Sequence, residues 1–372
     1  FRLNPFEFEI ATPPPGAAAQ PEERVHVQTH IDYLKSVFNA AFVLYAPMPY
    51  ILDTCLHEIY TDKGWSLISG HNRYLPDDER GHEARWPVFP TLTDLYEKID
   101  AVVERLGYDE RIRMDVTAGL KARIGSLRLG NKGLMLDTSH SIPMDELLAH
   151  PTVLELERMG NDDEKAFVIG LLLARLYEYR LIQARSTQGR AGLQHILVIE
   201  EAHRLLKNVR TEVGTEEANT KGQAVEAFAN MLSEIRAYGQ GVLVAEQIPT
   251  KLIPDVIKNT NLKILHRTVA RDDREVMAGA MNLVEGQQRV VAALPVYQAA
   301  VFAEGADRPY LVEMLPYKAH HLTGSQSDAQ LAQAMRPLVQ RPLYDLAPGY
   351  SRWLAGGRLD ARLQEVVRHV LA

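Results

Sequence analysis

The sequence predicts an α/β protein built on a parallel, doubly wound sheet. Short apolar runs typical of strands alternate with helical patterns between residues 195 and 313, and this alternation favours parallel strands joined by helices. The run Ile196–Ile199, four consecutive aliphatic residues, is typical of a strand buried on both faces of such a sheet. Polar residues directly follow three of the predicted strands, as expected at the edge where open sheets bind their ligands.

The chain divides into five predicted segments. Residues 1–10 are expected to form the first strand of the core, with a turn at Asn4-Pro5, and residues 11–28 a Pro/Ala-rich surface connection. Residues 29–128 carry helical patterns without a strand pattern, which predicts an inserted all-α subdomain. Residues 129–314 form the predicted α/β core, and residues 315–372 a polar, helical C-terminal arm.

Apolar spacing and turn residues predict the individual elements. In the all-α segment we expect one helix capped by Thr29, a second from about Pro47 to Gly64, and two more over residues 91–106 and 109–128. The core has predicted strands at 133–137, 152–156, 195–200, 241–247, 261–267, 298–304 and 310–313, and predicted helices at 162–185, 218–238, 250–258 and 271–294. The first half of helix 162–185 is apolar nearly all round, so this helix should be deeply buried.

The amino-acid composition excludes several classes of protein. With 46% hydrophobic and 24% charged residues the chain is not disordered throughout, and its net charge of −7 argues against coating nucleic acid by bulk charge. A local basic channel in an assembled ring stays compatible with that charge. The single cysteine, Cys55, rules out an internal disulfide framework and points to a reducing cytoplasm. No apolar run reaches the ~20 residues of a membrane helix, and the opening FRL without a starting methionine indicates part of a longer protein.

Acid, amide and guanidinium groups follow successive strands of the core. Glu200 and Glu201 end the strand at 195–200, Gln247 ends the next strand, and Arg267 ends the one after it. On one edge of a parallel sheet these groups would make a phosphate site, with Glu200 beside Mg²⁺ and Glu201 polarising the attacking water. Simpler interpretations also apply: a solvated acidic turn, a structural glutamine and a surface arginine.

Several longer stretches resemble the HerA/FtsK branch of P-loop ATPases, and most closely the HerA-like bacterial ATPases. The resemblance rests on ILVIEEAHRLL (196–206), SEIRAYGQGVLVAEQIP (233–249), NTNLKILHRTVARDDREVM (259–277) and LPVYQAAVFAEGADRPYLVEM (294–314), and it extends over most of residues 1–314. It implies a RecA-like P-loop NTPase core that binds ATP and Mg²⁺.

The resemblance also implies roles for individual residues. Glu200 matches the Mg²⁺-side acid of the Walker B motif, Glu201 the catalytic glutamate, and Gln247 the sensor at the end of the next strand. Arg236 is similar to the arginine that reaches the γ-phosphate of a neighbouring subunit, and Arg267 is a second candidate for that role. Arg236 is alternatively a helix-end cation favoured by the helix dipole.

One departure from the family is large, since no G-x-x-x-x-G-K-[ST] motif occurs in the 372 residues. The stretch GSLRLGNKG (125–133) has glycines and a lysine, but its spacing is wrong and no Ser or Thr follows the lysine. In the family this phosphate-binding loop lies N-terminal to the matching region. We therefore expect it in a preceding part of the protein.

The function expected from the resemblance is a cytoplasmic ATPase motor that forms a ring, expected to be a hexamer, and moves DNA as a translocase or helicase. Relatives act beside nuclease or sirtuin-like effectors in anti-phage defence, so an effector partner is implied. The alternative is a nucleotide-regulated assembly scaffold that oligomerises an effector without moving DNA. Turnover stimulated by DNA would distinguish the motor from the scaffold.

Overall fold

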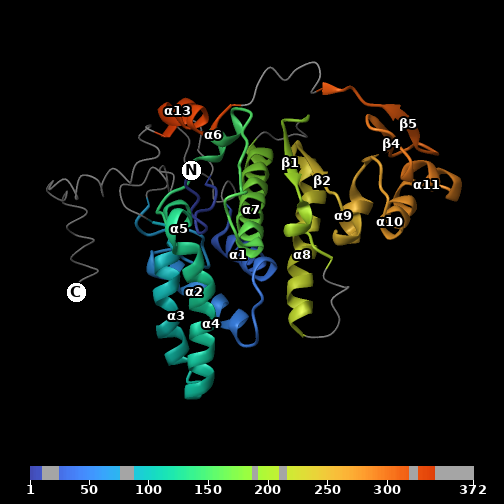
Figure 1. Ribbon diagram of the computed structural model, residues 1–372. Helices are drawn as coiled ribbons and strands as arrows, with labels where there is room; N and C mark the ends of the chain where they lie inside the picture. Colours follow the sequence, from blue (N-terminus) through green and yellow to red (C-terminus); the bar gives the residue numbers. More distant parts are fainter. Residues whose placement is uncertain (11–24, 76–87, 187–191, 209–215, 318–325, 340–372) are drawn as a thin grey trace. The chain divides into compact units, whose positions relative to one another are not determined.

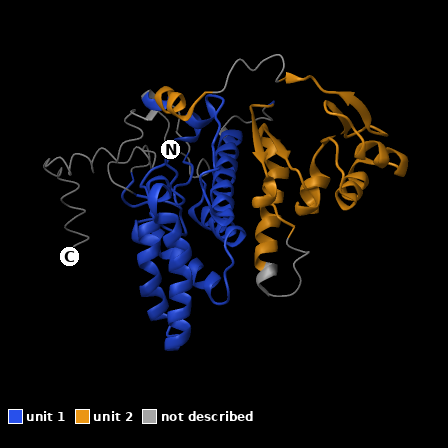
Figure 2. Ribbon diagram, in the orientation of Figure 1, with its two compact units in different colours: residues 1–192, 335–372 blue, residues 193–334 orange. Residues whose placement is uncertain are grey.

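A computed structural model describes residues 1–10, 25–75, 88–186, 192–208, 216–317 and 326–339. The chain separates into two units, residues 1–192 with 335–372 and residues 193–334 (Figure 2). The predicted division into five segments stays a prediction.

The first unit is helical (Figure 1). Its helices are α1 (Val27–Ala41), α2 (Met48–Asp62), α3 (Leu92–Arg105), α4 (Glu110–Arg128), α5 (Gly130–Leu136), α6 (Met144–Leu148) and α7 (Asp162–Ser186). Helix α1 packs on α7, and α3 packs on both α2 and α4. Helix α7 is buried along most of its length, as its all-round apolar pattern predicts.

Capping groups set the helix boundaries. Thr91 and Asp94 form a capping box at the start of α3, and Asp109 caps α4 by accepting from the Ile112 amide at 3.1 Å. Helix α1 starts earlier than expected, because His26 and not Thr29 caps it, its Nδ1 accepting from the Gln28 amide at 3.2 Å.

The NPFEF segment supplies the aromatic core of this unit. Phe8 lies with its ring centroid 4.8 Å from that of Trp65 and 5.2 Å from that of Phe89. The Tyr60 hydroxyl donates to the Phe6 carbonyl at 2.5 Å, which satisfies a polar group deep in the core. Asn4 forms the expected turn, with its side-chain oxygen accepting from the Phe6 amide at 2.9 Å.

Three predicted strands are wrong. Residues 1–9 form no strand ladder, residues 133–136 belong to helix α5, and residues 152–156 have no regular secondary structure. Short apolar runs do not distinguish a strand from a buried helical turn, and a strand also needs a partner. Val153 is 85% exposed, so the apolar residues of 152–156 find no such partner among the described residues.

The described residues of the second unit form two sheets. Strands β1 (His195–Glu200) and β2 (Gln240–Ala245) pair in parallel, with Val198 opposite Leu243 and Glu200 opposite Ala245. Strands β3 (Leu262–Leu265), β4 (Gln298–Ala303) and β5 (Tyr310–Glu313) pair antiparallel. The structure is therefore α/β with a parallel pair as predicted, while in the described residues the last three strands form a separate antiparallel sheet.

Helical segments join and cover these strands. They are η2 (Ala202–Arg204), α8 (Glu216–Glu234), η4 (Ile235–Tyr238), η5 (Pro249–Lys251), α9 (Pro254–Asn259), α10 (Arg271–Met281) and α11 (Glu285–Ala292). Helix α13 (Asp328–Val339) follows β5 in the chain and extends past the boundary between the two units. The helix predicted at 271–294 divides in two at Asn282, which takes a left-handed conformation with φ of 55°. Met281 and Leu294 pack with Leu265 in the core beneath β3 and β4.

Strand β1 is not buried on both faces, so that prediction is wrong. Ile196 and Val198 are 53% and 54% exposed, whereas Ile199 on the other face is 6% exposed. Leu243 of β2 lies on the same exposed face as Val198. The uninterrupted aliphatic run alone does not reveal which face a tertiary contact covers.

Candidate functional site

The carboxyl ends of β1 and β2 bring three predicted site residues to one edge of the sheet. The two strands are parallel and in register up to Glu200 and Ala245, so Glu201 and Gln247 leave the sheet at the same end. The Glu201 amide donates to the Ala245 carbonyl at 3.1 Å, which extends the pairing by one residue. This edge is where ligands of open parallel sheets bind.

Glu200 is exposed at the end of β1, on the face that carries Val198. An exposed carboxylate in this position suits Mg²⁺, which keeps several waters and takes only one or two protein carboxylates. Within the described residues no three His, Cys, Asp or Glu side chains gather into a metal site. A bound Mg²⁺ would therefore complete its shell with water and with oxygens of its ligand.

Glu201 has an uncommon backbone conformation. Its φ of 50° and ψ of 47° are left-handed, a region that costs a non-glycine residue about 1–3 kcal/mol. Its carboxylate accepts a 2.7 Å hydrogen bond from Nε of Arg204 and a second bond from Nη2 of the same residue. The side chain is 46% exposed, so it stays accessible to solvent at this edge.

Glu246, which sequence reasoning missed, organises this edge. Its Oε2 accepts from the His203 amide at 3.0 Å and lies 2.8 Å from His203 Nδ1, while its Oε1 accepts from the amides of Gln247 at 2.8 Å and Ile248 at 3.1 Å. Burial alone would raise the pKa of Glu246, but the His203 and backbone hydrogen bonds outweigh it and lower that pKa. The available signal was an acid at a strand end, directly before Gln247.

Arg267 is not joined to this group by any described contact. It lies two residues beyond β3, exposed, in the part of the unit that forms the antiparallel sheet. The structure therefore brings Glu200, Glu201 and Gln247 together at one edge and leaves Arg267 outside that edge.

Arg236 lies at the opposite end of β2. It belongs to η4, before the strand begins, and its Nη1 donates to Asn261 Oδ1 at 2.7 Å. The six residues of β2 lie between Arg236 and the end of the sheet from which Gln247 emerges. At about 3.3 Å per residue, a strand of this length spans about 20 Å. Arg236 thus cannot reach a phosphate held beside Glu201 of its own chain.

The glycine- and lysine-containing stretch at 125–133 forms no phosphate-binding loop. It covers the end of α4 and the start of α5, and Lys132 Nζ lies 2.5 Å from Glu164 Oε1 in an ion pair. A Cβ at Gly133 would lie 2.0 Å from the Arg128 carbonyl oxygen, so close backbone packing explains this glycine. The described residues fit the Mg²⁺ side of a nucleotide site, and stretch 125–133 does not fit its phosphate side.

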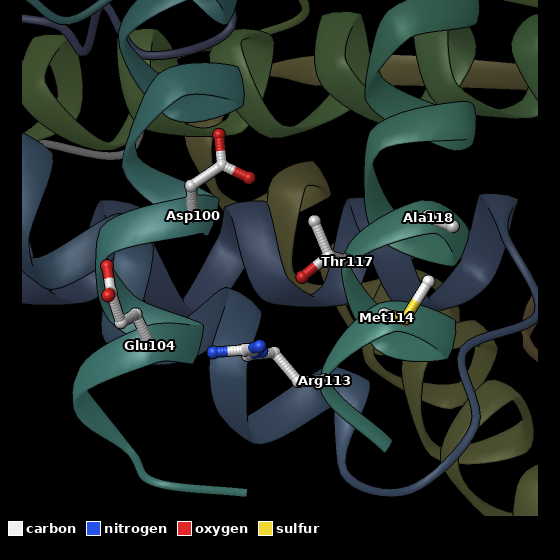
Figure 3. A pocket seen from close by; sticks show the side chains of 6 residues that line it. All are labelled: Asp100, Glu104, Arg113, Met114, Thr117 and Ala118. Atoms are coloured by element: carbon white, nitrogen blue, oxygen red, sulfur yellow. The ribbon is translucent and has the colours of Figure 1, made fainter. Parts of the chain in front are cut away.

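An open hollow between α3 and α4 is a separate feature of the first unit (Figure 3). Asp100 and Glu104 border it on α3, and Arg113, Met114 and Thr117 border it on α4. The Asp100 carboxylate already pairs with Lys121, and the hollow has neither a glycine-rich loop nor converging strand ends. It offers no chemistry of its own.

This chain is similar in structure, but not detectably in sequence family, to known proteins. A scan against protein-family models finds no match, and a search of curated protein sequences finds none either. VirB4 of Thermoanaerobacter pseudethanolicus matches with a TM-score of 0.52 and 17% identity, over 86% of this chain and 75% of the VirB4 chain.

Two further structures match more weakly. The bacterial conjugative coupling protein TrwBdeltaN70 has a TM-score of 0.44 and 13% identity, over 84% of this chain and 73% of its own. The genome packaging NTPase B204 of Sulfolobus turreted icosahedral virus 2, in complex with AMP, has a TM-score of 0.31 and 15% identity, over 47% and 73%. At 17% identity and a TM-score of 0.52, the VirB4 match shows that this chain shares the fold of VirB4.

Among the helices of the described residues, none combines the length and the apolarity needed to cross a membrane.

Proposed function

We propose that this chain carries the hydrolytic side of a P-loop ATPase motor with a RecA-like core. The observation that carries the proposal is the shared edge of β1 and β2, where Glu200, Glu201 and Gln247 emerge together. The fold shared with VirB4 supports it, because VirB4 is one of the FtsK/HerA-type P-loop ATPases.

Each residue at this edge has a separate task in the proposal. Glu200 holds Mg²⁺, directly or through water, and Mg²⁺ neutralises charge on the phosphates of ATP when both are bound. Glu201 orients and polarises the attacking water. Gln247, held two residues beyond the strand end, contacts the γ-phosphate and reports its presence.

The phosphate-binding loop comes from residues outside these 372 in this proposal. Among the described residues β2 pairs only with β1, and β3 only with β4, so β2 and β3 each present one unpaired edge. Unpaired strand edges accept a further strand through backbone hydrogen bonds. A strand added parallel to β2 would end beside Glu246 and Gln247 and would deliver its loop to the same edge of the sheet.

The distance of Arg236 from its own acidic edge supports assembly into a ring. An arginine that cannot reach the phosphate in its own subunit can complete the charge stabilisation only at a neighbour's site. We propose a HerA-like, hexameric DNA translocase or helicase on this basis and on the sequence resemblance. A nuclease or sirtuin-like effector partner rests on the resemblance alone.

Glu201→Gln in the full-length protein tests the proposal. The amide keeps the shape of the side chain but cannot polarise water, so ATP hydrolysis should be lost while Mg-ATP binding is retained. Glu313→Gln, at an exposed position of β5, serves as the matched control and should hydrolyse ATP normally. Near-normal turnover of Glu201→Gln would refute the assignment.

DNA dependence separates the motor from the assembly scaffold. A motor should hydrolyse ATP faster when duplex or single-stranded DNA is added. If added DNA does not change the rate of ATP hydrolysis, and the protein assembles only with an effector, the scaffold hypothesis is supported and the motor hypothesis is refuted.

A further inference from the structure

The carboxylate of Glu246 joins two segments that are far apart in the sequence. One oxygen binds both the amide and the ring Nδ1 of His203, and the other binds the amides of Gln247 and Ile248, with all four distances between 2.8 and 3.1 Å. The Glu246 side chain is 6% exposed. A carboxylate buried to this degree is stable only when its oxygens are satisfied, and here both are.

These contacts fix the position of both proposed catalytic segments. His203 belongs to η2, the turn that begins directly after Glu201, so holding its amide and its ring restricts the Glu201 backbone. The bonds to the amides of Gln247 and Ile248 hold the chain that leaves β2, and with it the Gln247 side chain. One carboxylate therefore sets the distance between the two segments.

We propose that Glu246 is a positioning residue that holds the water-polarising glutamate and the sensor glutamine in register across the carboxyl edge of β1 and β2. This inference rests on the proposed function, because the register matters only if Glu201 and Gln247 act on one phosphate. Positioning of this kind has large effects on rate, since small displacements of a reacting group are costly.

Glu246→Gln removes this function with little change of volume. All four partners of the carboxylate are donors when His203 carries its proton on Nδ1. A carboxamide has one accepting oxygen, and its NH₂ group faces two of these donors. At least two hydrogen bonds to a charged acceptor are therefore lost.

Amide hydrogen exchange of the 372-residue chain tests the geometry. In Glu246→Gln the remaining oxygen can still accept from one pair of donors. The amides that face the NH₂ group, either that of His203 or those of Gln247 and Ile248, should therefore exchange about tenfold faster or more, as expected for lost hydrogen bonds to a charged group. Amides of α10 should be unchanged, and Glu313→Gln should leave all of these amides as in the wild type. Unchanged exchange at His203 and Gln247 in Glu246→Gln would overturn the proposal.

Hydrolysis by the full-length protein tests the consequence. Glu246→Gln should lower kcat about tenfold or more while leaving KM for Mg-ATP near the wild-type value, and Glu246→Asp should recover part of the loss. A raised KM with unchanged kcat would overturn the positioning role and leave the proposed function standing. A wild-type protein that hydrolyses no ATP would overturn both.

Discussion

Arg175 of α7 neutralises buried carboxylates in the first unit, and replacing it with methionine should destabilise that unit strongly. Its Nη2 donates to Glu9 Oε1 at 2.7 Å, and its Nη1 lies 3.6 Å from Glu7 Oε2. Arg175 and Glu7 are 2% and 3% exposed, so neither can exchange its partner for bulk water. Methionine keeps the apolar stem and removes the charge.

The expected loss is about 3–5 kcal/mol in the free energy of unfolding, because the buried Glu7 and the largely buried Glu9 lose their cation. Urea unfolding measures it, followed by far-UV circular dichroism and by tryptophan fluorescence, to which Trp65, buried in the same unit, contributes. Arg289→Met is the control, since Arg289 is 78% exposed and its pair with Glu285 should contribute about 0.5 kcal/mol or less.

The pH dependence of the loss identifies its cause. Burial raises the pKa of Glu9 above its ordinary value of 4.5, and Arg175 opposes that rise. Without Arg175 the pKa of Glu9 in the folded state rises further, so the ionised form of Glu9 destabilises the folded state more. The destabilisation should therefore be full at neutral pH and should shrink as the pH falls through the raised pKa towards 4.5.

Two outcomes would refute this account of Arg175. A loss below about 1 kcal/mol would mean that the ion pairs of Arg175 contribute no more than exposed ion pairs do. A large loss that does not change with pH would assign the effect to packing alone. Adding Glu9→Gln to Arg175→Met should restore part of the stability, because one uncompensated charge is removed.

Three further predictions concern a helix cap, the trans arginine and the isolated chain. Thr91→Ala should lower stability by about 1 kcal/mol by breaking the capping box with Asp94, and an unchanged urea midpoint would contradict it. Arg236→Ala in the full-length protein should retain nucleotide binding but lose about 10³ or more in hydrolysis rate; mixing it with Glu201→Gln should restore some activity, and mixed rings without recovery would refute the trans role. The 372 residues alone should bind Mg-ATP weakly and hydrolyse none, since they lack the loop that cradles the phosphates, and calorimetry with a phosphate-release assay would reveal any exception.

Helix positions follow largely from the sequence because helices are made by local contacts. The apolar spacing of α1 to α4 and of α7, with Thr91 and Asp109 at two of the starts, predicted these helices within a few residues. Hydrogen bonds within one segment and a cap a few residues away decide such elements. The sequence also identified Glu200, Glu201 and Gln247, because these polar residues directly follow apolar runs typical of strands.

Strands and ionic contacts depended on tertiary partners that are distant in the sequence. The apolar run at 133–136 became part of a helix, and the three last strands paired antiparallel in a sheet of their own. A strand pattern states only that an extended segment would have an apolar side, while its direction and neighbours are settled by packing.

The sequence by itself determined the long helices of the first unit, within a few residues, and the residue types at the carboxyl edge of the parallel pair. Only the tertiary structure decided that Glu246 binds His203 and the Gln247 amide. It also decided that Arg175 pairs with Glu7 and Glu9, and that Arg236 lies at the end of β2 opposite to Gln247. The physical reason is that a charged group takes its role from the partners that surround it after folding. Those partners lie up to 168 positions away, as the separation of Arg175 from Glu7 shows (175 − 7).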